Sequence, residues 1–449
     1  MLSRILLLIF LLSLSFIPVA GAEGKNEPGT FAEIQDVISL PQNPFFYLSG
    51  DYNKRLISEE DQLDHVEEFL NLYFSPWEQS LPRHGMDVQN WIFEHLGNNR
   101  GYGENLRQRS PGWLEKQKDN ADLQAFGSLN RKAISIRPTD LRLLPTSRPF
   151  FHDPALAGEG FPFDYLQNSG VHGGEPLFIS HLSKDGAWAW SETSYAAGWI
   201  KLEDLAFVTK EFLDNWRSLP LGVFIADQTP LLNEKGIFRF MGNTGTILPI
   251  KSRGITANRI LLPVRAPDGN AIAEETVIDR EHFQVHPFPL TAWNTALVCE
   301  SVMDTPYGWG GYLENRDCSA TIRDIFLTFG IWLPRNSAAQ ARSGITLSLE
   351  GLDNEDKVYG LLREGIPFIT LVHKRGHVML YLGQYRGRPV ILHNTWGIRT
   401  LRKGKEGRHI IGKTVITTLE PGKELEDLYP GKGLLIDSIT SLTLLGGIR

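Results

Sequence analysis

The chain is most tightly constrained between Tyr307 and Gly330, where a loop rich in aromatic residues and glycine delivers a cysteine to a helix. The run Tyr-Gly-Trp-Gly-Gly begins at Tyr307, and Asp-Cys-Ser follows with Cys318 at its centre. After Cys318, apolar residues recur at intervals of three and four, which is the period of one buried helix face. These residues are Ile322, Ile325, Phe326 and Phe329. Gly330 is the expected end of this helix.

A cysteine in the first turn of a helix is placed to act as a nucleophile. Unpaired backbone N–H groups and the positive end of the helix dipole both favour the thiolate over the thiol. Free cysteine has a pKa near about 8.5, and each unit of downward shift is worth about 1.4 kcal/mol. We therefore expect Cys318 to be reactive, whereas Cys299, in an apolar stretch, is expected to be buried and inert. A disulfide between the two is the alternative.

A pair of strands joined by a turn is predicted after this helix. Residues 376–382 and residues 390–393 alternate in the manner of strands, and Gly383 and Gly387 bracket the turn between them. The turn is expected to centre on Tyr385.

Two histidines on this predicted hairpin can supply a base and its orienting group. A turn at that position places His377 directly opposite His393, with Cβ atoms about 4.5 to 5.5 Å apart. Asn394 is the rival third member, and it cannot serve together with His393 because adjacent strand residues point to opposite faces. Cysteine, base and orienting group in this chain order are the arrangement of papain-like thiol enzymes.

In combination, these motifs resemble those of the NlpC-type cell-wall peptidases, over residues 290–449. The resemblance implies that Cys318 is the nucleophile, His377 the base and His393 the group that orients it. It also implies a papain-like α+β catalytic domain, no metal or organic cofactor, and peptidoglycan stem peptides as the substrate. A zinc site is disfavoured because no ligand pair has the short spacing that such sites show.

Substrate contacts are expected, by the same resemblance, around the cysteine loop and on the first of two domains that resemble bacterial SH3-like domains, at residues 131–210. The expected residues are Tyr307, Trp309, Asp317, Ser319, Asn336, Ser337, Glu175 and Tyr195. Tyr307 is a candidate oxyanion donor beside the Cys318 backbone N–H, although Tyr307 and Trp309 could instead be simple packing residues.

The family uses an aspartate in an Arg-Asp-Ser motif to recognise the free amine of L-alanine. Here that motif stands as Arg335-Asn336-Ser337. Asparagine cannot supply the full negative charge that pairs with an ammonium group. The strict free-amine requirement of the family is therefore in doubt for this chain.

Five segments are predicted along the chain. They are a signal peptide at 1–22, a helical stabilising segment at 23–130, SH3-like domains at 131–210 and 211–289, and the catalytic domain at 290–449. Helices are expected at 61–73, 88–96 and 291–303, and the stretch 343–365 is expected to be variable and rich in glycine and charge. Short strands are expected at 134–136, 177–179, 187–190, 198–200, 222–226, 246–249 and 259–263.

The first residues have the composition of a secretory signal. Arg4 precedes an apolar run from Ile5 to Ala20, and the small residues Ala20-Gly21-Ala22 fit a cleavage site. An uncleaved membrane anchor is the alternative. We expect an exported protein of the periplasm or extracellular cell envelope, without stable membrane insertion after cleavage.

The overall charge limits the possible partners. The formal net charge is −7, and no basic face is evident, so nucleic-acid binding is not expected. No second apolar run is long enough to cross a bilayer. The sequence leaves the oligomeric state open.

The predicted function is hydrolysis of the bond between γ-D-glutamate and a diamino acid such as meso-diaminopimelate, in cell-wall turnover or recycling. One alternative keeps the thiol chemistry and cleaves another murein bond, as an amidase. Another is a non-catalytic wall-binding protein in which the SH3-like domains do the binding.

Overall fold

The helical segment at the start of the described chain holds five helices. The computed structural model describes residues 33–97 and 101–446, so the predicted signal peptide at 1–22 lies outside the described residues. The helices are α1 (Gln35–Ser39), α2 (Glu59–Tyr73), α3 (Ser75–Glu78), α4 (Met86–Gly97) and α5 (Pro111–Asn120). The predicted helices at 61–73 and 88–96 lie within α2 and α4 and are confirmed.

This helical segment braces the rest of the chain. The Trp77 indole N–H donates to the Ala133 carbonyl oxygen at 2.7 Å. The Gln62 side-chain amide donates to the Phe329 carbonyl oxygen at 2.9 Å. The segment therefore contacts both a β domain and the C-terminal domain, through buried hydrogen bonds that anchor it.

The first β domain comprises strands β1 to β7. They are β1 (Arg131–Ser135), β2 (Thr139–Arg142), β3 (Gln167–Val171), β4 (Pro176–Leu182), β5 (Trp188–Glu192), β6 (Ala197–Lys201) and β7 (Leu205–Phe207). Their order in the sheet is β3-β2-β6-β5-β4-β1-β7. The four predicted strands overlap β1, β4, β5 and β6. Residues 143–166 form a long connection between β2 and β3.

The second β domain follows α6 (Lys210–Ser218) and contains two sheets. The larger sheet has the order β13-β12-β11-β8-β14, and β9 pairs with β10 in the smaller one. The strands are β8 (Leu221–Phe224), β9 (Thr229–Leu232), β10 (Phe238–Gly242), β11 (Ile247–Arg253), β12 (Ala257–Arg265), β13 (Ala271–Asp279) and β14 (Phe283–Val285). The three predicted strands overlap β8, β11 and β12.

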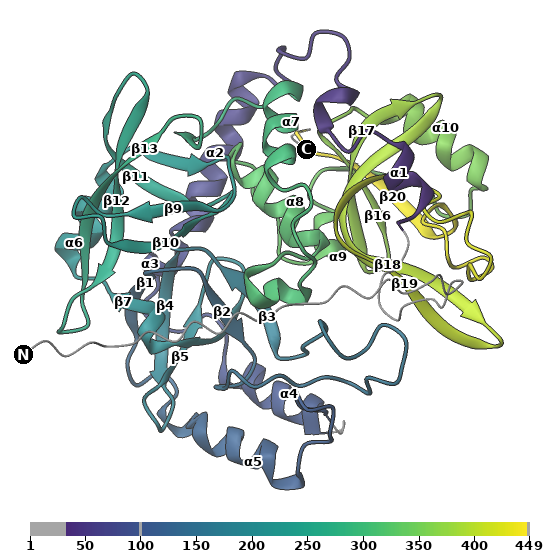
Figure 1. The fold of residues 1–449 in the computed structure, drawn as a ribbon. Helices are drawn as coiled ribbons and strands as arrows, with labels where there is room; N and C mark the ends of the chain where they lie inside the picture. Colours follow the sequence, from purple (N-terminus) through teal and green to yellow (C-terminus); the bar gives the residue numbers. More distant parts are fainter. Residues whose placement is uncertain (1–32, 98–100, 447–449) are drawn as a thin grey trace, which may run out of the picture. The chain divides into compact units, whose positions relative to one another are not determined.

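The C-terminal domain sets helices against an antiparallel sheet of order β15-β20-β16-β17-β18-β19. Its helices are α7 (Ala292–Ser301), α8 (Cys318–Leu327), α9 (Ser337–Gln340) and α10 (Asn354–Glu364). Its strands are β15 (Ile345–Ser348), β16 (Thr370–Lys374), β17 (His377–Tyr385), β18 (Arg388–Arg402), β19 (Lys405–Thr418) and β20 (Ile439–Leu444). Helix α8 lies against β17 and β18 (Figure 1).

The predicted fold class is confirmed. A helical segment, two β domains and an α+β domain follow one another as expected. The stretch 343–365, for which no helix or strand was predicted, contains β15 and α10. Its glycines and charges obscured the helical period, since Leu361 and Lys357 are the buried positions of α10.

The hairpin of β17 and β18 is present, but its predicted register is wrong. The turn consists of Arg386 and Gly387, both with positive φ (51° and 78°), as in a type I′ turn. Tyr385 is instead the last residue of β17. A bulge follows, and Leu380 pairs with Leu392, two residues away from the predicted register.

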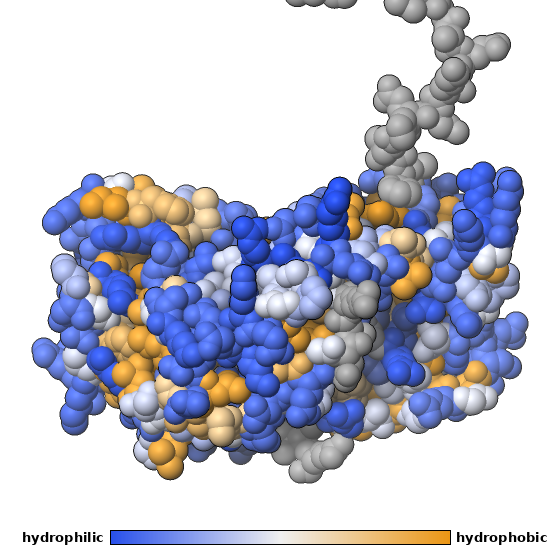
Figure 2. All heavy atoms as spheres, turned by 90° about the horizontal axis from the view of Figure 1, so that it is seen from below, coloured by the Kyte–Doolittle hydropathy of each residue, from blue (hydrophilic) through white to orange (hydrophobic). Residues whose placement is uncertain are grey.

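The surface face drawn in Figure 2 is mainly hydrophilic, and its apolar side chains lie in separate small patches. No helix in the described part of the chain is long and apolar enough to cross a membrane. Scattered apolar patches of this kind are ordinary for a folded domain.

Candidate active site

The nucleophile candidate is fixed by the start of α8. Cys318 is the first residue of the helix, and Asp317 is its N-cap, with a carboxylate oxygen that accepts from the Ala320 N–H at 2.8 Å. The Cys318 side chain is 8% exposed, on the face of α8 that meets β17. The predicted helix therefore begins at the cysteine itself.

The two glycines before the cysteine allow the backbone of the loop to pack in direct contact with the backbone of β3. Gly310 and Gly311 have φ of 64° and 89°, which favours glycine. A Cβ on Gly310 would lie 2.4 Å from the Gln167 carbonyl oxygen, and a Cβ on Gly311 would lie 2.6 Å from the Gly170 nitrogen. The first β domain thus fixes the loop that leads to Cys318.

Arg335 ties this loop, the helix start and the first β domain together. Its guanidinium donates to both Asp317 carboxylate oxygens, at 3.0 and 2.8 Å, and to the Ser169 hydroxyl at 2.8 Å. Burial opposes ionisation of Asp317, but the pairing with Arg335 holds the pKa of that carboxyl below its usual value. Sequence reasoning missed Arg335, although it belongs to the motif that supplied Asn336 and Ser337.

The two predicted histidines meet across the hairpin. His377 Nε2 lies 2.8 Å from His393 Nδ1, and both residues are buried. The register error of two residues preserves the face to which each side chain points, because the side-chain period of a strand is two. Asn394 points away from this pair and donates to the Thr305 carbonyl oxygen at 3.4 Å.

The environment of Cys318 differs from the sequence expectation of a lowered pKa. Burial, and next the charge of Asp317, raise the pKa of the thiol to about 12, although the Val378 N–H stabilises the thiolate. Burial and the neighbouring His393 lower the pKa of His377 well below its usual range. Burial thus opposes the charged form of both groups, and at Cys318 it outweighs the effect of the helix start on the pKa.

Tyr307 and Trp309 contribute to an aromatic cluster beside Cys318. Phe163, from the β2–β3 connection, lies 6.0 Å from Tyr307 and 5.5 Å from Trp309 between ring centroids. Trp396 of β18 lies 6.0 Å from Tyr307. Burial, and next the nearby Cys318, raise the pKa of Tyr307, so its phenol stays a hydrogen-bond donor. No pattern in the sequence pointed to Phe163 or Trp396.

Glu175 and Tyr195 of the first β domain both lie next to Arg323, which is in the second half of α8. Glu175 is 2% exposed, and a carboxylate oxygen lies 3.9 Å from the Arg323 guanidinium. Arg323 stacks over the Tyr195 ring at 4.0 Å, and the Tyr195 hydroxyl donates to the Gly170 carbonyl oxygen at 2.9 Å. Burial raises the pKa of Glu175. The structure thus brings this pair together at Arg323, and their role towards substrate stays a prediction.

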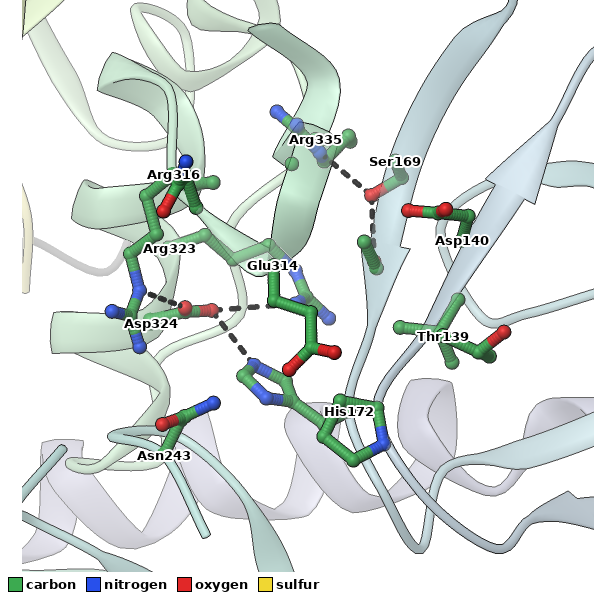
Figure 3. A pocket seen from close by; sticks show the side chains of 16 residues that line it. Thr139, Asp140, Ser169, His172, Asn243, Glu314, Arg316, Arg323, Asp324 and Arg335 are labelled. Carbon is green, nitrogen blue, oxygen red and sulfur yellow. Dashed lines mark hydrogen bonds and ion pairs between the residues drawn. The ribbon is translucent and has the colours of Figure 1, made fainter. Parts of the chain in front are cut away.

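A polar cavity of about 60 Å³ lies on the same side of α8, between β2, β3 and the helix (Figure 3). His172 Nε2 lies 3.0 Å from an Asp324 carboxylate oxygen. Arg316 donates to Asp324 at 2.7 Å and to Asp227 of the second β domain at 2.8 Å. The His172 contact joins α8 to the first β domain, and the two Arg316 ion pairs connect α8 to the second.

The other predicted contact residues stay close to the helix start. Ser319 donates to an Asp317 carboxylate oxygen at 3.0 Å. Asn336 is exposed, and its side-chain oxygen accepts from the Ala339 N–H at 2.8 Å, so it caps α9. Ser337 is the first residue of that helix. Within residues 33–97 and 101–446, no group of three His, Cys, Asp or Glu side chains could hold a metal ion.

Models of known protein families match four parts of the chain. The NLPC_P60 stabilising domain matches residues 4–126, an SH3 domain of SH3b1 type 149–201, an SH3 domain of SH3b2 type 210–254, and the NlpC/P60 family 304–405. The predicted domain order is thereby confirmed, while the predicted boundaries stay predictions.

A solved structure of high similarity gives the same result. An NlpC/P60 endopeptidase from Photobacterium damselae subsp. piscicida aligns with a TM-score of 0.83 and 25% identity, over 92% of this chain and 99% of that one. An NlpC/P60 family protein from Bacillus cereus ATCC 10987 has a TM-score of 0.46 and 18% identity, over 70% of this chain and 98% of that one. No curated protein matches the chain.

Proposed function

The chain belongs to the NlpC/P60 family of cell-wall cysteine peptidases, and we propose that it hydrolyses the bond between γ-D-glutamate and a diamino acid. The proposed substrates are murein stem peptides, with meso-diaminopimelate as the diamino acid. The proposal rests on Cys318 at the start of α8, beside the Val378 N–H of β17, and on the hydrogen-bonded pair His377 and His393 in the same sheet.

In the proposed first step, Cys318 attacks the γ-carbonyl carbon of D-glutamate. His377 takes the thiol proton as the carbon–sulfur bond forms, and the carbonyl electrons move to oxygen. The Cys318 backbone N–H has no intrahelical partner at the helix start and is the proposed first donor for that oxyanion, with the Tyr307 hydroxyl as the second. Because burial opposes the charged form of both Cys318 and His377, we propose that this proton transfer accompanies attack.

Collapse of the tetrahedral intermediate breaks the carbon–nitrogen bond. His377 protonates the departing amine of the diamino acid, which leaves a thioester of L-Ala-γ-D-Glu on Cys318. Water then attacks the thioester, with His377 as base, and the free carboxylate and thiol are regenerated. No metal or organic cofactor is needed for these steps.

Substrate selection is proposed to involve the first SH3-type domain and the α9 cap. Trp309, Phe163 and Tyr307 offer an apolar wall beside the thiol. Asp317 and Ser319 support the helix start through Arg335. Glu175, Tyr195, Asn336 and Ser337 are proposed contacts for the amino-terminal end of the peptide. Export to the periplasm or extracellular envelope, by the predicted signal peptide, is part of the same proposal.

Mass spectrometry of L-Ala-γ-D-Glu-meso-diaminopimelate after incubation with the protein tests this function. Wild type should release L-Ala-γ-D-Glu and free diaminopimelate, and Cys318→Ala should release neither. An amino-acetylated peptide in parallel measures the free-amine requirement. Cleavage of intact muropeptides at another bond would favour the amidase alternative, and no cleavage by folded protein would favour a wall-binding role.

A further inference from the structure

A threonine on the next strand completes the hydrogen-bond chain behind the two histidines. Strand β19 pairs with β18, with Val415 opposite His393. Thr417 lies two residues along β19 and therefore points to the same face of the sheet as Val415. Its hydroxyl oxygen lies 3.1 Å from His393 Nε2, and its side chain is fully buried.

The single hydroxyl proton of Thr417 determines which atoms donate and which accept in this series of hydrogen bonds. The Thr417 hydroxyl donates to the Thr418 carbonyl oxygen at 2.8 Å. With its proton committed there, the hydroxyl oxygen can only accept from His393, so His393 carries its proton on Nε2. His393 Nδ1 then holds a lone pair.

The proton position on His393 in turn determines the proton position on His377, the proposed base. Since His393 Nδ1 is an acceptor, the 2.8 Å contact must be donated by His377 Nε2–H. A neutral imidazole carries one proton, so His377 Nδ1 keeps its lone pair. That nitrogen is the one able to take a proton from Cys318.

We propose that Thr417 is a positioning residue that fixes the tautomers of His393 and His377, so that His377 presents a basic Nδ1 to the thiol. Without an acceptor at Nε2, His393 can carry its proton on Nδ1 and donate to His377 Nε2. His377 would then be protonated on Nδ1 and could not act as a base. A wrong tautomer of this kind is costly in other hydrolases whose base is a histidine.

Other charged groups near the pair cannot impose this choice. Lys374 pairs with His377 across the hairpin of β16 and β17, and its positive charge disfavours protonation of both imidazoles. His373 acts on His377 in the same direction. Both disfavour a second proton, and neither accepts a hydrogen bond from His393 Nε2 in the described structure.

The tautomers can be measured directly in the full-length protein without substrate. Two-bond proton–nitrogen correlation spectra of ¹⁵N-histidine-labelled protein should show Nε2–H on both His377 and His393, assigned with His377→Gln and His393→Gln. Thr417→Ser should keep this pattern, whereas Thr417→Val should shift His393 towards Nδ1–H. Wild type with Nδ1–H on either histidine would overturn the proposal, even if Thr417→Val failed to fold.

Kinetics supply the second readout, and they rest on the proposed function. On the tripeptide, Thr417→Val should lower kcat/KM by about 10-fold to 100-fold, as for other residues that orient a histidine. Thr417→Ser should stay within about threefold of wild type, because the hydroxyl is retained. Thr443→Val removes a buried hydroxyl that donates to the Ala341 carbonyl in the same sheet, and should leave activity unchanged. Equal activity of Thr417→Val and wild type would contradict the proposal.

Failure of the proposed function would look different. If the protein cleaves another bond, the tautomer spectra are unaffected, and the rate of Cys318 alkylation by iodoacetamide can replace hydrolysis as the readout. Thr417→Val should slow that alkylation while Thr417→Ser should not. Equal alkylation rates for Thr417→Val and wild type would count against the assigned role.

Discussion

Two faces of helix α8 contact different parts of the molecule: one contacts the sheet of the C-terminal domain, and the other contacts the β domains. On one face, Cys318 lies by the Val378 N–H of β17, next in the chain to His377, and the sheet register sets the places of His377 and His393. On the other face, Arg323 and Asp324 meet Glu175 and His172 of the first β domain. Arg316 connects Asp324 to Asp227 of the second β domain. The comparison suggests that the sheet face performs the chemistry, whereas the domain face holds the helix in position.

Removal of the thiol should give the largest effect. Cys318→Ala should lower kcat/KM on the tripeptide by more than about 10³-fold, because no other group can form the thioester. Cys299→Ala is the matched control, since Cys299 is fully buried in α7 and lies outside the proposed site. Activity of Cys318→Ala within tenfold of wild type would show that Cys318 is not the nucleophile, and that the face of α8 towards the sheet does not perform the reaction.

Removal of a cation from the domain face should act on stability. Arg316 pairs with Asp227 and Asp324, and Arg316→Met leaves the buried Asp227 carboxylate without its counterion and Asp324 with one partner fewer. We expect a loss of about 3 to 5 kcal/mol in the free energy of unfolding, measured with urea. Arg217→Met breaks an exposed pair with Glu78 and should cost less than about 1 kcal/mol. Equal losses for the two variants would contradict a structural role for the junction.

The domain face should also make stability depend on pH. His286, between the second β domain and α8, lies 3.1 Å from the Leu327 carbonyl oxygen, and burial lowers its pKa to about 4. The unfolded chain, with a histidine pKa near about 6.5, binds this proton more readily, so stability is complete above pH 6.5 and falls as the pH drops towards 4.

This dependence can be measured by urea unfolding at pH 7.5 and at pH 5. His286→Gln should reduce the loss of unfolding free energy between the two by about 2 kcal/mol. His282→Gln is the control, because that histidine is exposed near the same strand. An unchanged pH dependence in His286→Gln would show that its imidazole is not held neutral. His377 and His393 are also buried and have lowered pKa values. They therefore add to the loss of unfolding free energy at pH 5 in every variant that retains these two histidines.

A charge at the α9 cap should sharpen substrate selection. Asn336→Asp keeps the side-chain oxygen that caps α9 and adds a negative charge. Preference for the free-amine tripeptide over its acetylated form should rise by about two- to fivefold, the value of one exposed ion pair. Asp353→Asn, at the cap of α10, is the control and should change neither rate. A constant preference would place Asn336 outside amine recognition.

Glu175 should have the smallest effect on catalysis. Arg323 already lies beside its carboxylate, so Glu175→Gln should change KM for the free-amine tripeptide by less than about threefold. Glu192→Gln serves as a control carboxylate elsewhere in the first β domain, where it accepts from the Arg83 and His84 backbone N–H groups. A tenfold rise in KM confined to the free-amine peptide would show instead that the charge of Glu175 dominates amine recognition.

The sequence predicted the site wherever local periodicity determined it. Helical spacing after Cys318 located α8, and strand alternation placed His377 and His393 on one face even though the turn was misplaced. The Arg386–Gly387 turn and the bulge moved the register by two residues, which alternation alone cannot detect. Burial of Cys318 was also beyond periodicity, so the direction of its pKa shift was misjudged.

Contacts between segments far apart in the chain could not be predicted. Arg335 reaches Asp317 and Ser169 only because the first β domain packs against the loop before α8. Phe163 enters the aromatic cluster from a connection with no regular pattern. Thr417 depends on the pairing of β18 with β19, since nothing in its local sequence distinguishes it from Thr418.

The central claim is that Cys318 forms a thioester with the γ-carbonyl of D-glutamate, and partitioning with hydroxylamine tests it most directly. Wild type, incubated with the tripeptide and hydroxylamine, should release diaminopimelate and yield the γ-hydroxamate of L-Ala-D-Glu in proportion to the hydroxylamine added. Cys318→Ala should yield neither product. Release of L-Ala-γ-D-Glu without hydroxamate at every concentration, or equal hydroxamate from Cys318→Ala, would contradict a thioester on Cys318.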